Sequence, residues 1–231
     1  MISQIQTNIR YNRPMTTWPA PPFWLVPLPG QAHIFRLPLD LPEARLEALR
    51  PLLDEAEQAR AARYLFERDR RRFIAARGQV RQILGFCLER RPEDLRFRLS
   101  ARGKPALDEP TCLRFNLSHS RLLGLLAVCA GQDVGIDLEA GRDEADTAGI
   151  ARRFFTPGEA ARLQALPEEQ RRAAFYTCWT RKEAYLKGRG EGLAVSLSSF
   201  EVSFAPGEPP QVFTLPERTP DPDWRLYDLR P

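Results

Sequence analysis

The N-terminal half of the chain alternates between strand-like and helix-like spacing of its hydrophobic residues. Residues 33–39 alternate apolar and polar side chains, which predicts a strand. Helical spacing follows over residues 43–53, 56–66 and 69–88. The last of these helices is amphipathic, and its apolar side consists of Phe73, Val80, Ile83, Leu84 and Cys87.

Strand-like spacing dominates the middle of the chain. Strands are predicted over residues 95–99, 115–118, 122–129 and 134–139. Residues 103–105, Gly-Lys-Pro, predict a turn. Ser118-His119-Ser120 is interpreted as a tight connection between two of the strands.

Helices return in the C-terminal half. Residues 156–159, Thr-Pro-Gly-Glu, combine a capping box with proline at the first helical position, so a helix begins there. A second helix is expected to begin at Pro167, to run to Lys187 and to end at Gly188. Short strands are expected near Phe200, Val212 and Trp224. This mixture of helices and strands predicts an α+β fold with helices packed on antiparallel sheets.

The length of 231 residues allows one sizeable core or two small lobes. Residues 1–30 are rich in proline and aromatic residues and predict an extended N-terminal segment. We place a boundary near residue 133, which gives an N-terminal lobe over 31–133 and a C-terminal lobe over 134–231. The two lobes have a similar coarse pattern without a sequence repeat.

The sequence favours a cytoplasmic protein. Its longest nearly apolar run, residues 122–130, is less than half of the roughly 20 residues that a membrane-spanning helix needs. The N-terminus lacks the apolar region of a secretory signal. The four cysteines are far apart and lack zinc-ligand spacing, so we expect reduced thiols.

Positive charge is concentrated in one stretch. The net charge is +4, and residues 60–91 contain ten Arg against three acidic residues. Such a stretch favours an anionic ligand or an acidic partner, although a solvated helix face gives the same pattern. Only three of the 34 basic residues are lysines, namely Lys104, Lys182 and Lys187. Lysine is expected to remain where a compact ammonium group is needed.

Two short patterns suggest a metal site. Asp137 and Glu139 lie two apart in a predicted strand and therefore share one face. Paired carboxylates without His or Cys suit Mg²⁺ or Mn²⁺, although a solvated sheet edge would also accommodate them. Trp179, Glu183 and Lys187 share one helix face. An ordinary Glu183–Lys187 surface pair is the alternative there, but the Trp on the same face indicates partial burial.

Residues 116–120, Asn-Leu-Ser-His-Ser, offer hydroxyl and backbone donors suited to phosphate, although a plain polar turn has the same composition. No G-x-S-x-G elbow is present, which argues against a serine nucleophile. Carboxylates, cations and this turn together favour a metal-assisted reaction at a pyrophosphate, using neither a P-loop nor a Rossmann turn.

Five motifs in order carry a family resemblance: RGKP (102–105), FNLSHS (115–120), VGIDLE (134–139), RFFTPGE (153–159) and WTRKEAYLK (179–187). Over about residues 33–205 the chain resembles the 4'-phosphopantetheinyl transferases of the surfactin-synthetase-activating (Sfp-like) type. This resemblance implies two similar α+β lobes related by a pseudo-twofold axis, with the active site in the cleft between them, in a monomer.

The resemblance also implies the activity. The phosphopantetheine arm of coenzyme A would pass to a serine of an apo acyl or peptidyl carrier protein, releasing adenosine 3',5'-bisphosphate. Asp137, Glu139 and Glu183 would hold Mg²⁺, with Mn²⁺ as the other option. Glu183 would also act as general base, directly or through a water molecule. Lys187 would hold the pyrophosphate and protonate the departing bisphosphate.

Other residues match coenzyme A contacts. Gly103, Lys104 and Pro105 would flank the adenine nucleotide. The phosphates would be contacted by Arg60 and Arg72, with Arg77 as the alternative, and by Asn116, Ser118 and His119. No nucleic acid or membrane is expected as a partner, and carrier proteins are acidic, which suits a basic enzyme.

Relatives commonly have one more strand after the segment that matches residues 224–229. We therefore expect either a second sheet that is one strand short or an edge covered by the N-terminal segment. Three other functions are weighed against the transferase. They are a metal-dependent hydrolase of coenzyme A or nucleotide pyrophosphates, a non-catalytic coenzyme A-binding protein, and a nucleic-acid-binding module. The last leaves the three carboxylates unexplained.

Overall fold

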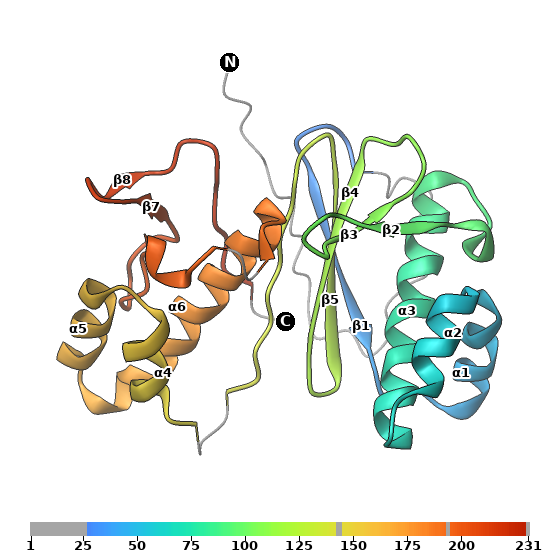
Figure 1. The fold of residues 1–231 in the computed structure, drawn as a ribbon, viewed down its shortest axis with the longest axis horizontal. Coiled ribbons are helices and arrows are strands. Elements are labelled where there is room, and N and C mark those ends of the chain that lie inside the picture. The colour runs from blue at the N-terminus through green and yellow to red at the C-terminus, as the bar shows by residue number, and fades with distance from the viewer. Residues whose placement is uncertain (1–26, 142–144, 193–194, 230–231) are drawn as a thin grey trace. The chain divides into compact units, whose positions relative to one another are not determined.

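A computed structural model describes residues 27–141, 145–192 and 195–229 (Figure 1). The chain forms two units, residues 1–99 with 105–134, and residues 100–104 with 135–231. Both units combine helices with antiparallel strands, which confirms the α+β prediction. Most of the predicted N-terminal segment, residues 1–26, lies outside the described residues. Within the described part, no helix has the length and hydrophobicity to cross a membrane.

The first unit is built around a three-stranded antiparallel sheet. Its order is β1 (Ala32–Pro38), β5 (Leu123–Ala130) and β4 (Leu113–Ser120). The central strand β5 is almost entirely apolar and is buried from Gly124 onward, as expected of a strand with a neighbour on each side. A separate hairpin pairs β2 (Phe97–Leu99) with β3 (Pro105–Leu107).

Helices cover one face of this sheet (Figure 1). They are α1 (Glu43–Leu49), α2 (Glu55–Ala62) and α3 (Glu67–Leu88), with short 3₁₀ turns at Arg50–Leu52 and Pro92–Asp94. The predicted apolar side of α3 enters the core, where Val80, Leu84 and Cys87 are buried and Phe73 and Ile83 are partly buried. Burial raises the pKa of the Cys87 thiol to about 11, which keeps it protonated at neutral pH.

A buried arginine connects α2 and α3. Asp54 caps α2 in a capping box with Glu57, and Arg81 of α3 donates to both carboxylates. Its remaining donors reach the carbonyl oxygens of Pro92 and Leu95 at 3.0 Å. Arg81 is fully buried, so this set of partners is what makes its burial tolerable. Part of the basic stretch therefore serves packing rather than ligand binding.

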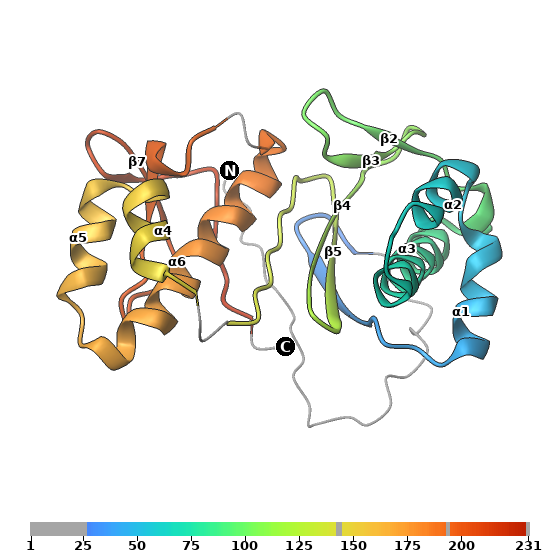
Figure 2. The ribbon, with the colours of Figure 1, turned by 60° about the horizontal axis from the view of Figure 1, so that its bottom comes forward.

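The second unit packs three helices against a small sheet. The helices are α4 (Thr147–Phe154), α5 (Pro157–Ala165) and α6 (Glu168–Arg189). The sheet pairs β6 (Phe200–Val202), β7 (Val212–Thr214) and β8 (Thr219–Pro220) in that order, and a 3₁₀ turn at Leu197–Ser199 precedes it. Aromatic rings of Phe155, Phe175 and Trp179 stack in its core. Helices α4 and α5 lie beside α6 (Figures 1 and 2).

The helix boundaries of this unit largely follow the prediction. The capping box at Thr156 and Glu159 is present, and α5 begins at Pro157. Helix α6 begins at Glu168 after Pro167 but ends two residues later than predicted, because Gly190 (φ +68°) rather than Gly188 takes the left-handed cap position. Helix α4 was not predicted from the sequence.

Two predictions in the first unit are wrong. The helix predicted over 56–66 ends at Ala62, and the next four residues form the turn into α3. Ser118-His119-Ser120 is not a connection, because β4 continues through Ser120 and the hairpin turns at Arg121 and Leu122. Pairing of Ser118 with Leu125 extends the ladder past the point where polarity suggested a break.

Two predicted strands of the second unit are not among the strands of the described structure. Within the described residues, neither 134–139 nor Trp224 belongs to a strand. The indole of Trp224 instead packs edge-on against the Tyr185 ring, with centroids 5.6 Å apart. Ile136 is buried, and Trp224 packs on the core of this unit.

A close approach of Gly135 to α6 fixes residues 134–139. A Cβ atom at Gly135 would collide with the Ala184 carbonyl oxygen and the Gly188 amide and would lie 2.8 Å from Gly188 Cα. We expect Gly135→Ala to lower the free energy of unfolding by at least about 1–3 kcal/mol, the usual cost of overpacking, because only backbone atoms could yield. Thermal denaturation measures this.

Gly141→Ala is the matched control for this substitution. Its Cβ would meet only ring carbons of Tyr176, the nearest at 3.3 Å, and these can shift slightly. Equal melting temperatures for the two variants would contradict the packing that we describe.

Candidate functional site

The predicted site residues fall into the two units. Those in the second unit are Gly103, Lys104, Asp137, Glu139, Glu183 and Lys187. Those in the first unit are Arg60, Arg72, Pro105, Asn116, Ser118 and His119.

A group of three carboxylates and one ammonium forms on one side of α6. Lys187 Nζ lies 2.5 Å from Asp137 Oδ1, and the Asp137 side chain is only 5% exposed. Burial raises the pKa of the half-buried Glu183, and the charges of Asp137 and Glu139 raise it further, whereas Lys187 lowers it. The charges of Asp137 and Glu139 therefore act on Glu183.

The backbone around this group explains how it forms without a strand. Gly135 brings residues 134–139 against α6, so that Asp137 meets a residue one helical turn beyond Glu183. Lys187 thus pairs with Asp137, and its charge also acts on Glu183. Trp179, on the same helix face, stacks on Phe175 and is partly buried, which confirms that this face is not simply solvated.

The donor set suits a hard cation. All three side chains offer oxygen, and no His or Cys takes part. Across residues 27–141, 145–192 and 195–229, no three acidic, His or Cys side chains already surround a point where a metal ion would sit. Ammonium–carboxylate pairing at Asp137 offsets part of the negative charge, and the raised pKa of Glu183 shows that repulsion remains. A divalent cation would relieve that repulsion, so the residues fit such an ion.

Lys104 is held at the C-terminal end of α6. Its ammonium donates to the Gly188 carbonyl oxygen at 2.6 Å, a favourable place for a cation because carbonyls at a helix end are unpaired. The Lys104 amide donates to Ser100 Oγ at 3.0 Å, and Gly103 (φ +84°) takes the left-handed conformation that the turn requires. A turn is therefore present, but it lies at residues 101–103 and Pro105 already begins β3, so the predicted Gly-Lys-Pro turn is shifted. The Lys104 side chain fixes this turn to the helix that carries Glu183.

Lys182 does not belong to this group. Its side chain is fully buried and pairs with Glu159, also fully buried, at 2.7 Å. It donates further to the carbonyl oxygens of Leu197 and Phe200. The scarcity of lysine singled out three lysines, and one of them, Lys182, forms a buried ion pair in the core.

The first-unit residues lie on β4 and around α3. Asn116 and Ser118 are buried and share one face of β4, while His119 is exposed. Consecutive strand residues point to opposite faces, so Ser118 and His119 do not form the turn-shaped cradle that the sequence suggested. The physical reason is that both residues are paired with β5 within the sheet.

The arginines that were predicted to contact the phosphates differ in their surroundings. Arg77 pairs with Glu57 and lies 4.8 Å over the Phe97 ring, so its guanidinium serves packing. Arg60 is exposed and lies 5.3 Å over the Phe73 ring, and Arg72 is 3.8 Å from Asp69. Arg60 and Arg72 are therefore better placed than Arg77 to meet a ligand.

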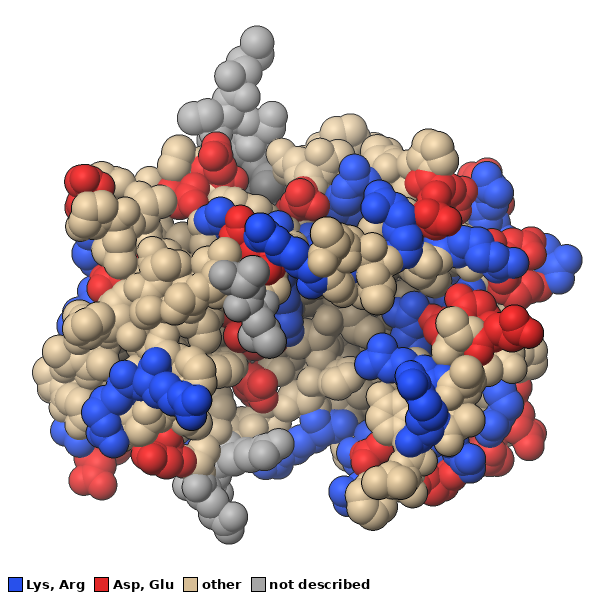
Figure 3. All heavy atoms as spheres, viewed as in Figure 1, with Lys and Arg blue, Asp and Glu red and all other residues tan. Residues whose placement is uncertain are grey.

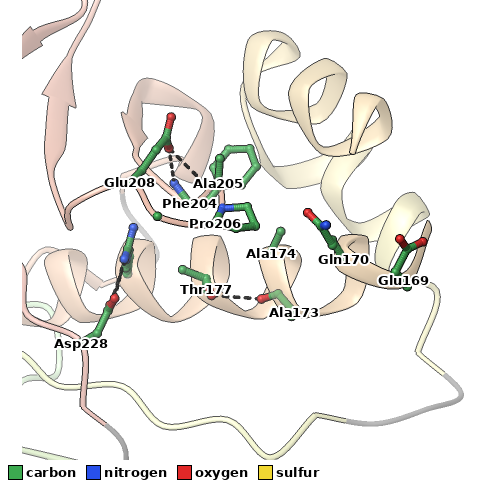
Figure 4. A pocket seen from close by; sticks show the side chains of 12 residues that line it. Glu169, Gln170, Ala173, Ala174, Thr177, Phe204, Ala205, Pro206, Glu208 and Asp228 are labelled. Carbon is green, nitrogen blue, oxygen red and sulfur yellow. Dashed lines mark hydrogen bonds and ion pairs between the residues drawn. The ribbon is translucent and has the colours of Figure 1, made fainter. Parts of the chain in front are cut away.

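A pocket of about 340 Å³ lies elsewhere on the second unit (Figure 4). It opens between the first half of α6, around Ala173 and Thr177, and the loop 204–208. Two of the charged residues that line it, Arg181 and Asp228, pair with each other at 2.6 Å. None of the predicted site residues lines it, and no sequence pattern pointed to it.

The chain matches two family models. Residues 133–229 match the 4'-phosphopantetheinyl transferase superfamily, and residues 42–132 match the model "4'-phosphopantetheinyl transferase, N-terminal". Similar proteins include 4'-phosphopantetheinyl transferase HetI of Nostoc sp., which is 42% identical over 218 residues, 93% of this chain and 89% of the relative.

Two Bacillus relatives are more distant. The transferase psf-1 of Bacillus pumilus is 36% identical over 167 residues, 71% of this chain and 70% of the relative. The transferase Sfp of Bacillus subtilis is 29% identical over 173 residues, 73% of this chain and 75% of the relative.

Proposed function

This chain belongs to the 4'-phosphopantetheinyl transferase superfamily and transfers phosphopantetheine from coenzyme A to carrier proteins, and on that premise we propose that Asp137, Glu139 and Glu183 hold a divalent cation at the coenzyme A pyrophosphate. The observation that supports this most is that Asp137 and Glu139 lie near enough to Glu183 for their charges to add to the effect of burial in raising its pKa. The hydrolase alternative is not favoured, because the relatives are transferases.

The proposed cation is Mg²⁺, with Mn²⁺ as an alternative, because both prefer oxygen ligands. When bound, it would draw charge from the phosphate oxygens as the bond to the leaving group breaks.

The chain's own residues move the proton and orient the groups. The carrier serine oxygen attacks the phosphorus that bears the pantetheine arm, and the bond from that phosphorus to adenosine 3',5'-bisphosphate breaks. Glu183, whose pKa is raised mainly by burial, takes the serine proton. Lys187 places its ammonium beside the leaving bisphosphate and donates a proton to it.

Coenzyme A contacts are proposed in both units. Gly103, Lys104 and Pro105 flank the adenine nucleotide. Because the ammonium of Lys104 is bound to the end of α6, we assign this contact to the turn rather than to the charge. The phosphates are contacted by Arg60, Arg72, Asn116, Ser118 and His119. We further propose a cytoplasmic monomer whose partner is an apo acyl or peptidyl carrier protein.

Intact-protein mass spectrometry tests this function. The protein is incubated with coenzyme A, Mg²⁺ and an apo carrier protein, with and without EDTA. We expect a gain of one phosphopantetheine on the carrier that EDTA abolishes. Release of bisphosphate without carrier modification would instead indicate the hydrolase, and EDTA-resistant transfer would contradict the metal site.

We expect Lys187→Ala to lower kcat more than it raises the KM for coenzyme A. The ammonium stabilises charge that develops only as the leaving group departs, so its loss affects the chemical step. Steady-state kinetics with coenzyme A as the varied substrate measure both constants. Lys187→Arg keeps the charge and should recover part of kcat. A change in KM alone would make Lys187 a binding residue only.

A further inference from the structure

The turn between α2 and α3 exposes consecutive hydrophobic side chains. Tyr64, Leu65 and Phe66 are 37%, 93% and 61% exposed, and Leu65 is the most exposed large hydrophobic residue of the described chain. Single exposed hydrophobic residues are common, but adjacent ones on a monomer mark interaction surfaces. We call residues 63–66 the α2–α3 turn.

This turn is held in a defined conformation. The Tyr64 amide donates to the Ala61 carbonyl oxygen at 3.3 Å, and the Tyr64 ring packs 5.4 Å from the Phe73 ring. The Phe66 carbonyl oxygen accepts from the amides of Asp69 and Arg70 in the first turn of α3. The exposed side chains are therefore presented by a fixed backbone, which lowers the entropy cost of docking.

The surroundings of the turn are basic. Residues 60–72 contain six arginines against Glu67 and Asp69. Arg60 and Arg63 are exposed and have no ion pair among the described residues. Figure 3 shows basic side chains, with acidic ones between them, over the side of the unit that α2 and α3 form. A partner that buries Leu65 here must therefore present acidic groups around an apolar patch.

We propose that the α2–α3 turn is a docking surface for the apo carrier protein, with Leu65 against an apolar patch of the carrier and Arg63 against its acidic residues. This proposal rests on the proposed function, which requires the enzyme to hold a folded protein as its second substrate. The turn is also bracketed by the arginines assigned to coenzyme A, with Arg60 on α2 before it and Arg72 on α3 after it. A second copy of this chain is disfavoured as the occupant, because two such arginine-rich surfaces would repel each other.

Two substitutions test the surface. Leu65→Ser removes the exposed hydrophobic side chain, and Arg63→Glu reverses a charge that has no partner within the described residues. We expect each to raise the KM for the carrier about tenfold, the typical effect of losing a central interface contact. The KM for coenzyme A and kcat at saturating carrier should not change. Leu122→Ser is the control, because Leu122 is 49% exposed in the β4–β5 turn of the same unit.

The outcomes separate the surface from the function. Active wild-type protein with an unchanged carrier KM in both variants would overturn the docking surface alone. Equal increases in the KM values for carrier and coenzyme A would also overturn it, since the turn would then act on the whole site. Wild-type protein that modifies no carrier would overturn the proposed function and this surface with it. Sedimentation velocity that shows a dimer dissociated by Leu65→Ser would assign the surface to a second copy instead.

Discussion

We expect the Glu183→Gln protein to be folded and almost inactive. Glutamine keeps the shape of the side chain but removes the charge that attracts the cation and the base that takes the serine proton. Losing several kcal/mol of transition-state stabilisation corresponds to a loss of roughly 10³-fold or more in kcat/KM. Asp137→Asn should have a similar effect on transfer. Mass spectrometry of the carrier measures the activity.

Stability distinguishes this loss from unfolding. Burial raises the pKa of Glu183, and the charges of Asp137 and Glu139 raise it further. A neutral side chain at 183 removes both the cost of burying a charge and this repulsion, so it should not lower the melting temperature. Glu169→Gln on the same helix is the matched control, because Glu169 is exposed and lies far along α6 from the carboxylates. Calorimetric titration with Mg²⁺ should show weakened binding only for the site variants. If the Glu183→Gln protein retained its turnover, Glu183 would not belong to the proposed site.

The second large effect is expected on stability at Lys182. Lys182→Met leaves the Glu159 carboxylate buried without its cation and frees two carbonyl oxygens. Breaking one side of a buried ion pair typically costs about 3–5 kcal/mol. Glu159 also accepts from the amides of Thr156 and Val202, so the start of α5 and strand β6 should loosen together. Denaturant unfolding measures the loss.

The double variant Lys182→Met/Glu159→Gln provides the internal test. It removes both charges, so it should be more stable than Lys182→Met alone. Arg91→Met is the surface control, because the Arg91 side chain is 75% exposed beside Glu93 and its loss should change stability little. If the double variant is no more stable than the single one, the interaction that matters is packing rather than charge.

Local sequence signals were sufficient for most helices. The capping box at Thr156 and Glu159 and the apolar side of α3 depend on residues close in the chain, and both appear as predicted. Residue type and spacing singled out Asp137, Glu139 and Glu183, and the family resemblance implied their role as metal ligands, which stays a prediction. Arg77 was left as an alternative to Arg72 because helical spacing does not reveal which arginine meets Glu57 across two helices.

Tertiary contacts decided the rest. The local pattern of residues 134–139 does not reveal that Gly135 approaches α6 so closely that a Cβ atom would meet the backbone of Ala184 and Gly188. The pairing of Ser118 with Leu125 on the neighbouring strand extended β4 through residues whose polarity had suggested a break. Lys182 and Lys187 have the same side chain five residues apart, yet the fold buries the first against Glu159 and pairs the second with Asp137. Sequence determines which groups are available for chemistry, whereas burial and partners, which depend on residues distant in the chain, determine what each group does.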